Sequence, residues 1–161
     1  MSIATTLEDC LREKGSEYDV LQHRHTHTSA ETAEAAHIPA DRLAKTVLLE
    51  DELGYVAAVL PATHRLQLAK LWAQTGRRLV LARESDLPSL FKDCDIGAIP
   101  PVCAAYGLPT YVDQSLASQT DVYFEAGDHE ALIHMRTQQF MDLMEQAETA
   151  RFSRRRPAYQ H

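Results

Sequence analysis

The apolar residues of the chain follow two kinds of spacing. Helical spacing predicts helices over residues 3–11, 29–37, 66–75 and 140–144, and a short helix or turn over residues 85–91. Continuous or alternating apolar runs predict strands over residues 18–22, 43–50, 55–60, 78–82, 121–125 and 131–135, with further strand-like flanks at 96–99 and 110–112. Hairpins and helical crossovers both occur in this order. We therefore expect an α+β fold, a single domain whose mixed sheet curls toward a barrel with helices around it.

Two hairpins are expected within this sheet. The turn Asp51-Glu52-Leu53-Gly54 separates the strands at 43–50 and 55–60, which we place at the centre of the sheet. A second pair of strands surrounds a turn at Gly127.

The segment Cys94–Asp113 combines glycines and prolines with apolar residues, which is typical of a shaped loop. Gly97 can adopt backbone dihedrals that other residues avoid, and Pro100 and Pro101 lack N–H donors. The remaining donors around Gly97 and Ala98 are then free to face a ligand. We expect this loop to form one wall of an active site.

Composition places the chain among cytoplasmic globular proteins. Its 161 residues are 45% apolar and 24% charged, and no apolar run approaches the roughly 20 residues of a membrane span. The N-terminal residues do not resemble a secretion signal. The three cysteines, Cys10, Cys94 and Cys103, form no C-x-x-C pair, which fits a reducing compartment. Cys103 has apolar neighbours, so we favour a packing role for it over a nucleophilic one.

Charge separates an acidic body from a basic end. Residues 1–150 contain all 23 acidic residues but 12 of the 16 Lys and Arg, a net charge of −11. Residues 151–161 add Arg151, Arg154, Arg155 and Arg156. We therefore divide the chain into a domain over 1–150 and a basic C-terminal tail over 151–161. A solvated, frayed tail is favoured over an RNA-binding one, and the acidic body argues against a nucleic-acid coat and a DNA partner.

Three patterns together resemble one family. They are the lysine entering an apolar strand (Ala44-Lys45-Thr46-Val47-Leu48-Leu49), the loop Gly97-Ala98-Ile99-Pro100 and the late strand–glycine–strand turn over 123–129. The chain resembles the YbaK/prolyl-tRNA synthetase editing-domain family over nearly its whole length. Members of that family hydrolyse wrongly charged aminoacyl-tRNA, either as a domain inserted in prolyl-tRNA synthetase or as free-standing proteins.

The resemblance implies a free-standing aminoacyl-tRNA deacylase that needs no cofactor. Its partners would be a mischarged tRNA and, as a helper, a synthetase or the basic tail; no membrane partner is expected. Lys45 would anchor the 3′ end of the tRNA, and the N–H groups around Gly97 and Ala98 would polarise the ester carbonyl. The amino acid would be small, such as alanine, serine, threonine or cysteine. The proposed substrate-binding residues are His23, His25, Thr46, Ile99, Pro100, Pro101, Gly127 and His129.

Two other classes of function stay open. The run His23, His25 and His27 would place three imidazoles on one face of a strand, which suits a metal-dependent hydrolase. No carboxylate or cysteine completes the set at a familiar spacing, so we predict no metal site. The other alternative is a non-catalytic module that binds aminoacyl-tRNA or a small ligand.

Overall fold

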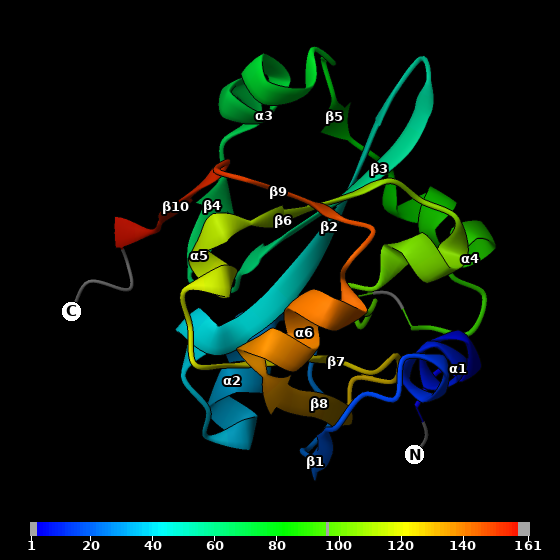
Figure 1. Ribbon diagram of the computed structural model, residues 1–161, viewed down its shortest axis with the longest axis vertical. Coiled ribbons are helices and arrows are strands. Elements are labelled where there is room, and N and C mark those ends of the chain that lie inside the picture. Colours follow the sequence, from blue (N-terminus) through cyan, green and yellow to red (C-terminus); the bar gives the residue numbers. More distant parts are fainter. Residues whose placement is uncertain (1–2, 96, 158–161) are drawn as a thin grey trace.

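The computed structural model describes residues 3–95 and 97–157 (Figure 1). The helices in this part of the chain are α1 (Thr5–Glu13), α2 (Ser29–Ala36), α3 (Leu68–Thr75), α4 (Leu87–Leu90), α5 (Gln114–Ala117) and α6 (Thr137–Leu143), with 3-10 helices η1 (Ala40–Arg42), η2 (Glu84–Asp86) and η3 (Cys103–Tyr106). The strands are β1 (Asp19–Gln22), β2 (Leu43–Asp51), β3 (Gly54–Pro61), β4 (His64–Leu66), β5 (Val80–Leu81), β6 (Thr110–Asp113), β7 (Asp121–Glu125), β8 (Ala131–Arg136), β9 (Glu148–Ala150) and β10 (Ser153–Arg155).

A mixed sheet forms the centre of the molecule, in the order β1-β8-β7-β2-β3-β6-β9. Antiparallel hairpins supply β2–β3 and β7–β8, as the two turns predict. Parallel pairings join β2 to β7, β3 to β6 and β6 to β9. The prediction of a single α+β domain with a mixed sheet is confirmed.

The two faces of the sheet pack against different helices. On one face, α1 and α6 contribute Leu7, Leu11 and Phe140 to a core with Phe124 of β7. In a second cluster, Leu71 of α3 packs with strand residues and with Phe152. Figure 1 shows α6 beside β7 and β8, and α3 at the far end of the molecule. The apolar helix positions therefore bury the sheet on both sides.

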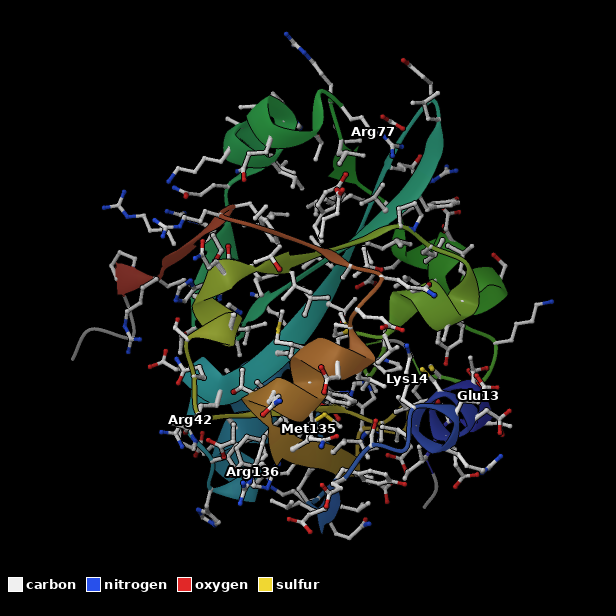
Figure 2. All side chains as sticks on the ribbon, viewed as in Figure 1. Glu13, Lys14, Arg42, Arg77, Met135 and Arg136 are labelled. Carbon is white, nitrogen blue, oxygen red and sulfur yellow. The ribbon has the colours of Figure 1, made fainter. Side chains whose placement is uncertain are left out.

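The tip of the β2–β3 hairpin is tied to the segment that follows α3. Asp51 accepts a hydrogen bond from the N–H of Leu53 (2.9 Å), and its carboxylate pairs with both Nε (2.8 Å) and Nη2 (2.5 Å) of Arg77. Figure 2 shows Arg77 beside this hairpin. A bidentate pair of this kind holds the turn in one orientation.

One edge of β2 is only partly covered. Along this edge β7 pairs with Leu43 and Ala44, and β5 pairs with Leu49 and Glu50. Within the described part of the chain, no strand pairs with residues 45–47 on this side, although Leu48 O accepts a hydrogen bond from Ala82 N–H (3.0 Å). We call this opening in the edge of β2 the notch.

The loop before η3 differs from its prediction. Residues 97–99 do not form the expected strand, and Ile96 lies outside the described residues. Gly97 has a φ of +87°, and the N–H of Ala98 donates to Asp95 O (3.1 Å), which closes a turn. A residue with positive φ interrupts strand geometry, so this flank bends. The other flank is a strand, β6, as predicted.

Hydrogen bonds to side chains cap the start of α2. Thr28 is the N-cap, because its hydroxyl accepts a hydrogen bond from the N–H of Glu31 (3.1 Å). The carboxylate of Glu31 in turn accepts the N–H of His27 (3.0 Å). This reciprocal arrangement fixes the chain entering α2 next to the notch.

The end of the chain is folded where the structure describes it. Phe152 is fully buried, and its N–H donates to Asp113 Oδ1 (2.8 Å). Strand β10 pairs with β4 in antiparallel register. The expectation of a frayed tail is therefore wrong for residues 152–155, because a buried aromatic side chain and strand pairing anchor them. The domain boundary at residue 150 stays a prediction, and residues 158–161 lie outside the described part.

No helix among the described residues is both long and apolar enough to cross a membrane.

Candidate functional site

A cavity of about 360 Å³ opens at the notch. Its wall includes β2 residues 44–48, and the facing residues come from the loop after α4 (Gly97, Ile99), the segment before α2 (His27) and the end of β7 (Glu125). The cavity therefore brings together Lys45, Thr46, Gly97 and Ile99 of the predicted site. It exists because β7 ends before β5 begins along the same edge of β2.

Lys45 lies on β2 beside the notch, opposite Leu60 of β3. Burial and, to a smaller extent, the nearby charge of Arg156 together lower the pKa of Lys45 to about 8. A partly buried ammonium in a cationic neighbourhood gains more from an anionic ligand than a lysine in water does. Lys45 therefore brings a partly buried cation to the cavity wall, and its binding of a phosphate stays a prediction.

Gly97 brings the loop backbone against a histidine ring. A Cβ atom added at Gly97 would lie 2.9 Å from Cε1 and 3.2 Å from Nε2 of His129. His129 itself is buried and has a positive φ of 63°. Among the described residues we find no hydrogen-bond partner for the N–H of Gly97. This contact between backbone and ring requires glycine and leaves a donor at the cavity wall.

Ala98 does not provide the second free donor that the sequence suggested. Its N–H donates to Asp95 O (3.1 Å), and the residue is fully buried. The expectation that this N–H faces a ligand is therefore wrong, because the turn at Gly97 consumes it.

Glu125 is a buried carboxylate in the cavity wall. Its Oε2 accepts a hydrogen bond from Thr32 Oγ1 (2.9 Å), and Thr32 Oγ1 also lies 2.6 Å from Thr26 Oγ1. Burial raises the pKa of Glu125 to about 7; the hydrogen bond from Thr32 opposes the rise, and the charge of Asp128 adds to it. Glu125 can therefore change its protonation state near neutral pH.

His23 faces the other oxygen of this carboxylate. Nε2 of His23 lies 3.7 Å from Glu125 Oε1. Nδ1 of His23 lies 2.6 Å from Arg24 O, and since a carbonyl only accepts, Nδ1 carries the proton. In the neutral ring Nε2 is then an acceptor.

Three buried polar atoms in or beside the cavity wall lack hydrogen-bond partners. Within the described part of the chain these are Thr46 Oγ1, Glu125 Oε1 and His23 Nε2. Buried polar groups are paired in the great majority of cases, and unpaired ones concentrate where a ligand completes them. The cavity is therefore polar at one end and suited to a ligand with donor groups.

The histidine run does not form the predicted strand face. Strand β1 ends at Gln22, and His23 turns toward Glu125. The rings of His25 and His27 instead gather near His129, with centroids 5.2 Å and 6.4 Å from it. Over residues 3–95 and 97–157, no group of three or more His, Cys, Asp or Glu is arranged to hold a metal ion.

Sequence comparison assigns this architecture to a family. The model of the aminoacyl-tRNA editing domain matches residues 23–143, about three quarters of the chain. The chain belongs to the aminoacyl-tRNA editing domain family. The match begins at His23 and includes β2, the Gly97 loop and the turn at His129. A comparison with curated proteins finds no significant match.

Solved structures share the fold of this editing domain. Hypothetical protein APE2540 superposes with a TM-score of 0.82 at 25% identity, covering 92% of this chain and 99% of its own. A protein described as a candidate trans-editing enzyme for prolyl-tRNA synthetase superposes with a TM-score of 0.81 at 24% identity, covering 94% and 96%. A candidate signal transduction protein from Marinobacter aquaeolei VT8 matches at 19% identity and TM-score 0.77, covering 94% of this chain but 31% of its own. The fold thus also occurs within a longer chain.

Some residues of the predicted site lie outside the lining of the editing-domain cavity. Pro100 and Pro101 are buried and are not among the described residues that line it. Gly127 packs against α1, since an added Cβ would lie 2.9 Å from Cβ of Ala4, and its carbonyl accepts the N–H of Asp95 (2.7 Å). These residues position the loop, and their contact with substrate stays a prediction. The side chain of Cys103 lies outside what the structure describes.

Glu125 and His27 are lining residues that the sequence-based site omits. The available signal was an acidic residue that ends the apolar strand Val122–Phe124. An ionisable residue at a buried strand position is uncommon and points to a partner or a site.

A second cavity, of about 320 Å³, lies between α1, η3 and α6. Its lining includes Cys10, Lys14 and Leu143, and it contains none of the predicted site residues. Lys14 forms an ion pair with Glu145 there, and Figure 2 shows Glu13 and Lys14 at the end of α1. This cavity provides an internal comparison for tests of the notch.

Proposed function

We propose that this editing domain is a hydrolase that removes a wrongly attached small amino acid from tRNA, acting as a free-standing protein. The observation that carries the proposal is the cavity at the notch, whose lining includes Lys45, Gly97 and Glu125. These groups offer a cation, a backbone donor and an acceptor. An aminoacyl ester at the end of a tRNA presents the matching set of a phosphate, a carbonyl and an α-ammonium.

The ester is already activated, so the catalytic demand is modest. In the proposed reaction Lys45 holds the phosphate or ribose of the terminal adenosine. The N–H of Gly97 points to the ester carbonyl and stabilises the oxyanion as water adds to the carbonyl carbon. The C–O bond to the ribose then breaks, and the proton from the attacking water passes to the departing ribose oxygen. The products are a free amino acid and an uncharged tRNA.

The polar end of the cavity is assigned to the amino acid. Glu125 Oε1 and Thr46 Oγ1 are buried without partners in the described part of the chain, and each can accept a hydrogen bond. The α-ammonium of the substrate supplies donors to such acceptors. A cavity of about 360 Å³ must also hold part of the ribose, so the remaining space favours a small side chain.

Deacylation of a panel of radiolabelled aminoacyl-tRNAs tests the proposal. The panel carries alanine, serine, threonine or cysteine on non-cognate tRNAs, with and without a chelator. We expect one small species to lose its label, and Lys45→Ala to slow that loss at least about hundredfold, as expected when a group that binds the substrate's charge is removed.

Lys92→Ala is the matched control, because Lys92 is exposed and does not line the cavity. It should match the wild type. If no species is cleaved, the hydrolase proposal fails and a non-catalytic binding role replaces it. If the chelator abolishes cleavage, a metal-dependent reaction replaces the water attack described above.

A further inference from the structure

Strands β4 and β10 form a two-stranded ribbon with an unusual charge pattern. Arg154 of β10 lies directly opposite Arg65 of β4 in the antiparallel register. Arg156 continues the ribbon, since its N–H donates to Thr63 O (2.9 Å). All three arginines are exposed. We call Arg65, Arg154 and Arg156 the cationic ribbon.

The cationic ribbon has no carboxylate partner among the described residues. Other arginines of the chain do: Arg42 pairs with Asp121 (2.9 Å) and Arg77 with Asp51 (2.5 Å). Like charges directly opposite each other in a sheet are destabilising. The ribbon therefore keeps an arrangement that costs stability unless an anion binds it.

The ribbon leads to the cavity at the notch. Thr63, which holds Arg156, follows shortly after the β3 residues that pair with β2, where Ala44 lies opposite Pro61 and Lys45 opposite Leu60. The charge of Arg156 is close enough to lower the pKa of Lys45. Arg156 therefore links the exposed ribbon to the lysine in the cavity wall, and we call the ribbon together with Lys45 the track.

The track is preorganised and stands out from the rest of the molecule. Phe152 is buried in the core, and Arg155 is tied to Asp41 (2.5 Å), so β10 is held in place. The chain as a whole has a net charge of −7. A cluster of unpaired cations on an acidic protein indicates a specific anionic partner, because the acidic remainder repels polyanions elsewhere.

We propose that the cationic ribbon binds the phosphodiester backbone of the tRNA strand that leads to the 3′-terminal adenosine, with Lys45 continuing the track at the cavity. This inference rests on the proposed function for the identity of the RNA. It adds the direction from which the RNA reaches the cavity. It also makes the last strand of the chain part of the substrate-binding surface.

Substitution of the arginines by glutamine tests the ribbon without removing the core residue Phe152. Arg65→Gln, Arg154→Gln, Arg156→Gln and the triple variant are compared with Arg136→Gln. Arg136 is exposed and lies away from β10 (Figure 2), so it removes one charge elsewhere. Two quantities are measured: the Kd for uncharged tRNA as a function of salt, and KM and kcat for the aminoacyl-tRNA that the panel identifies.

Each single variant should weaken tRNA binding about three- to tenfold and reduce the slope of log K against log salt by about 1. The triple variant should raise the Kd for uncharged tRNA at least about thirtyfold. It should raise KM for the aminoacyl-tRNA and leave kcat unchanged. Hydrolysis of the matching aminoacyl-adenosine, which lacks the RNA backbone, should fall less than hydrolysis of the aminoacyl-tRNA in every ribbon variant. Arg136→Gln should bind tRNA like the wild type.

The ribbon and the proposed function fail in different ways. Wild-type tRNA affinity and salt slope in the triple variant would overturn the ribbon, whatever the hydrolysis result. An equal loss in Arg136→Gln would also overturn it, because the effect would then be one of net charge. Ribbon-dependent tRNA binding without hydrolysis of any ester would leave the ribbon standing and overturn the proposed function.

Discussion

At the scale of single residues, Gly97 controls how closely the loop approaches the cavity. Its φ of +87° disfavours a side chain, and an added Cβ would meet the ring of His129 at 2.9 Å. Gly107 has a similar φ of +81°, but an added Cβ would meet nothing within 4 Å. Alanine substitutions at Gly97 and Gly107 can therefore distinguish the cost of a positive φ from the cost of the contact with His129.

Gly97→Ala should therefore lower the stability of the protein more than Gly107→Ala does. We expect both to lose roughly 1–2 kcal/mol of stability from the positive φ, and Gly97→Ala to lose more because the ring of His129 must shift. Deacylation should fall at least about tenfold in Gly97→Ala alone. Urea denaturation and initial rates measure the two effects. Equal deacylation rates in the two variants would show that Gly97 is not part of the site.

Glu125 makes stability depend on pH with a defined sign. Its pKa is raised to about 7 by burial, with Thr32, Asp128 and His23 as the groups around it. Between about pH 4.5, the unfolded value, and pH 7 the folded state holds the proton more tightly, so stability falls as the pH rises. Above about pH 7 the stability contributed by the protonated Glu125 is lost.

Glu125→Gln should remove this dependence, since an amide does not ionise. The variant should gain on the order of 3 kcal/mol over the wild type at pH 8 and little at pH 4.5. Glu34→Gln, at an exposed position on α2, is the control and should show no such change. Denaturation curves at the two pH values decide this. A stability difference that is the same at both would contradict the buried, proton-binding carboxylate.

The sequence located those site residues that carry a local signal. Lys45 enters an apolar strand and Gly97 precedes a proline pair, and both line the cavity. Glu125 carries a weaker signal, an acidic residue at the end of an apolar strand, because its hydrogen-bond partner Thr32 lies 93 positions away in the sequence. The sequence also carried no signal for the hydrogen bond of the Ala98 N–H, since that bond depends on how the turn at Gly97 closes.

At the scale of elements, the notch in β2 arises from strands that are short. The sequence predicted both hairpins and most helices, where apolar spacing extends over five or more residues. It missed β4, β9 and β10, which have three residues each and carry little periodic signal. Parallel pairings such as β2 with β7 join distant segments, so no local pattern reveals where the edge of β2 is left open.

Phe152 and the strand β10 that follows it should be required for folding, whereas a dispensable tail would not be. Phe152 is fully buried in the cluster that contains Leu71 and Val56. Phe152→Ala should lower stability by about 3–5 kcal/mol through loss of burial and the resulting cavity. Arg154→Gln, at an exposed position of the strand that follows Phe152, should change stability by less than about 0.5 kcal/mol. Thermal denaturation that shows the same stability for Phe152→Ala and wild type would make residues 151–161 a separate tail.

At the scale of the whole molecule, we compare two of its cavities as the place of chemistry. The cavity at the notch holds Lys45, Thr46, Gly97 and Glu125, while the one between α1 and α6 holds Cys10 and Lys14. Membership in the editing-domain family and the shared fold support aminoacyl-tRNA as the ligand. Because the chain has a net charge of −7, the cationic ribbon is the part of its surface that we propose for an RNA strand.

The measurement that tests the central claim most directly is single-turnover hydrolysis of a small mischarged aminoacyl-tRNA by variants of the two cavities. Lys45→Ala and Gly97→Ala alter the notch, and Cys10→Ala and Asp9→Asn alter the cavity at α1. We predict that the chemical rate falls at least about tenfold in both notch variants and stays at the wild-type value in both α1 variants. A rate that is unchanged in the notch variants, or lost only in the α1 variants, would contradict the account.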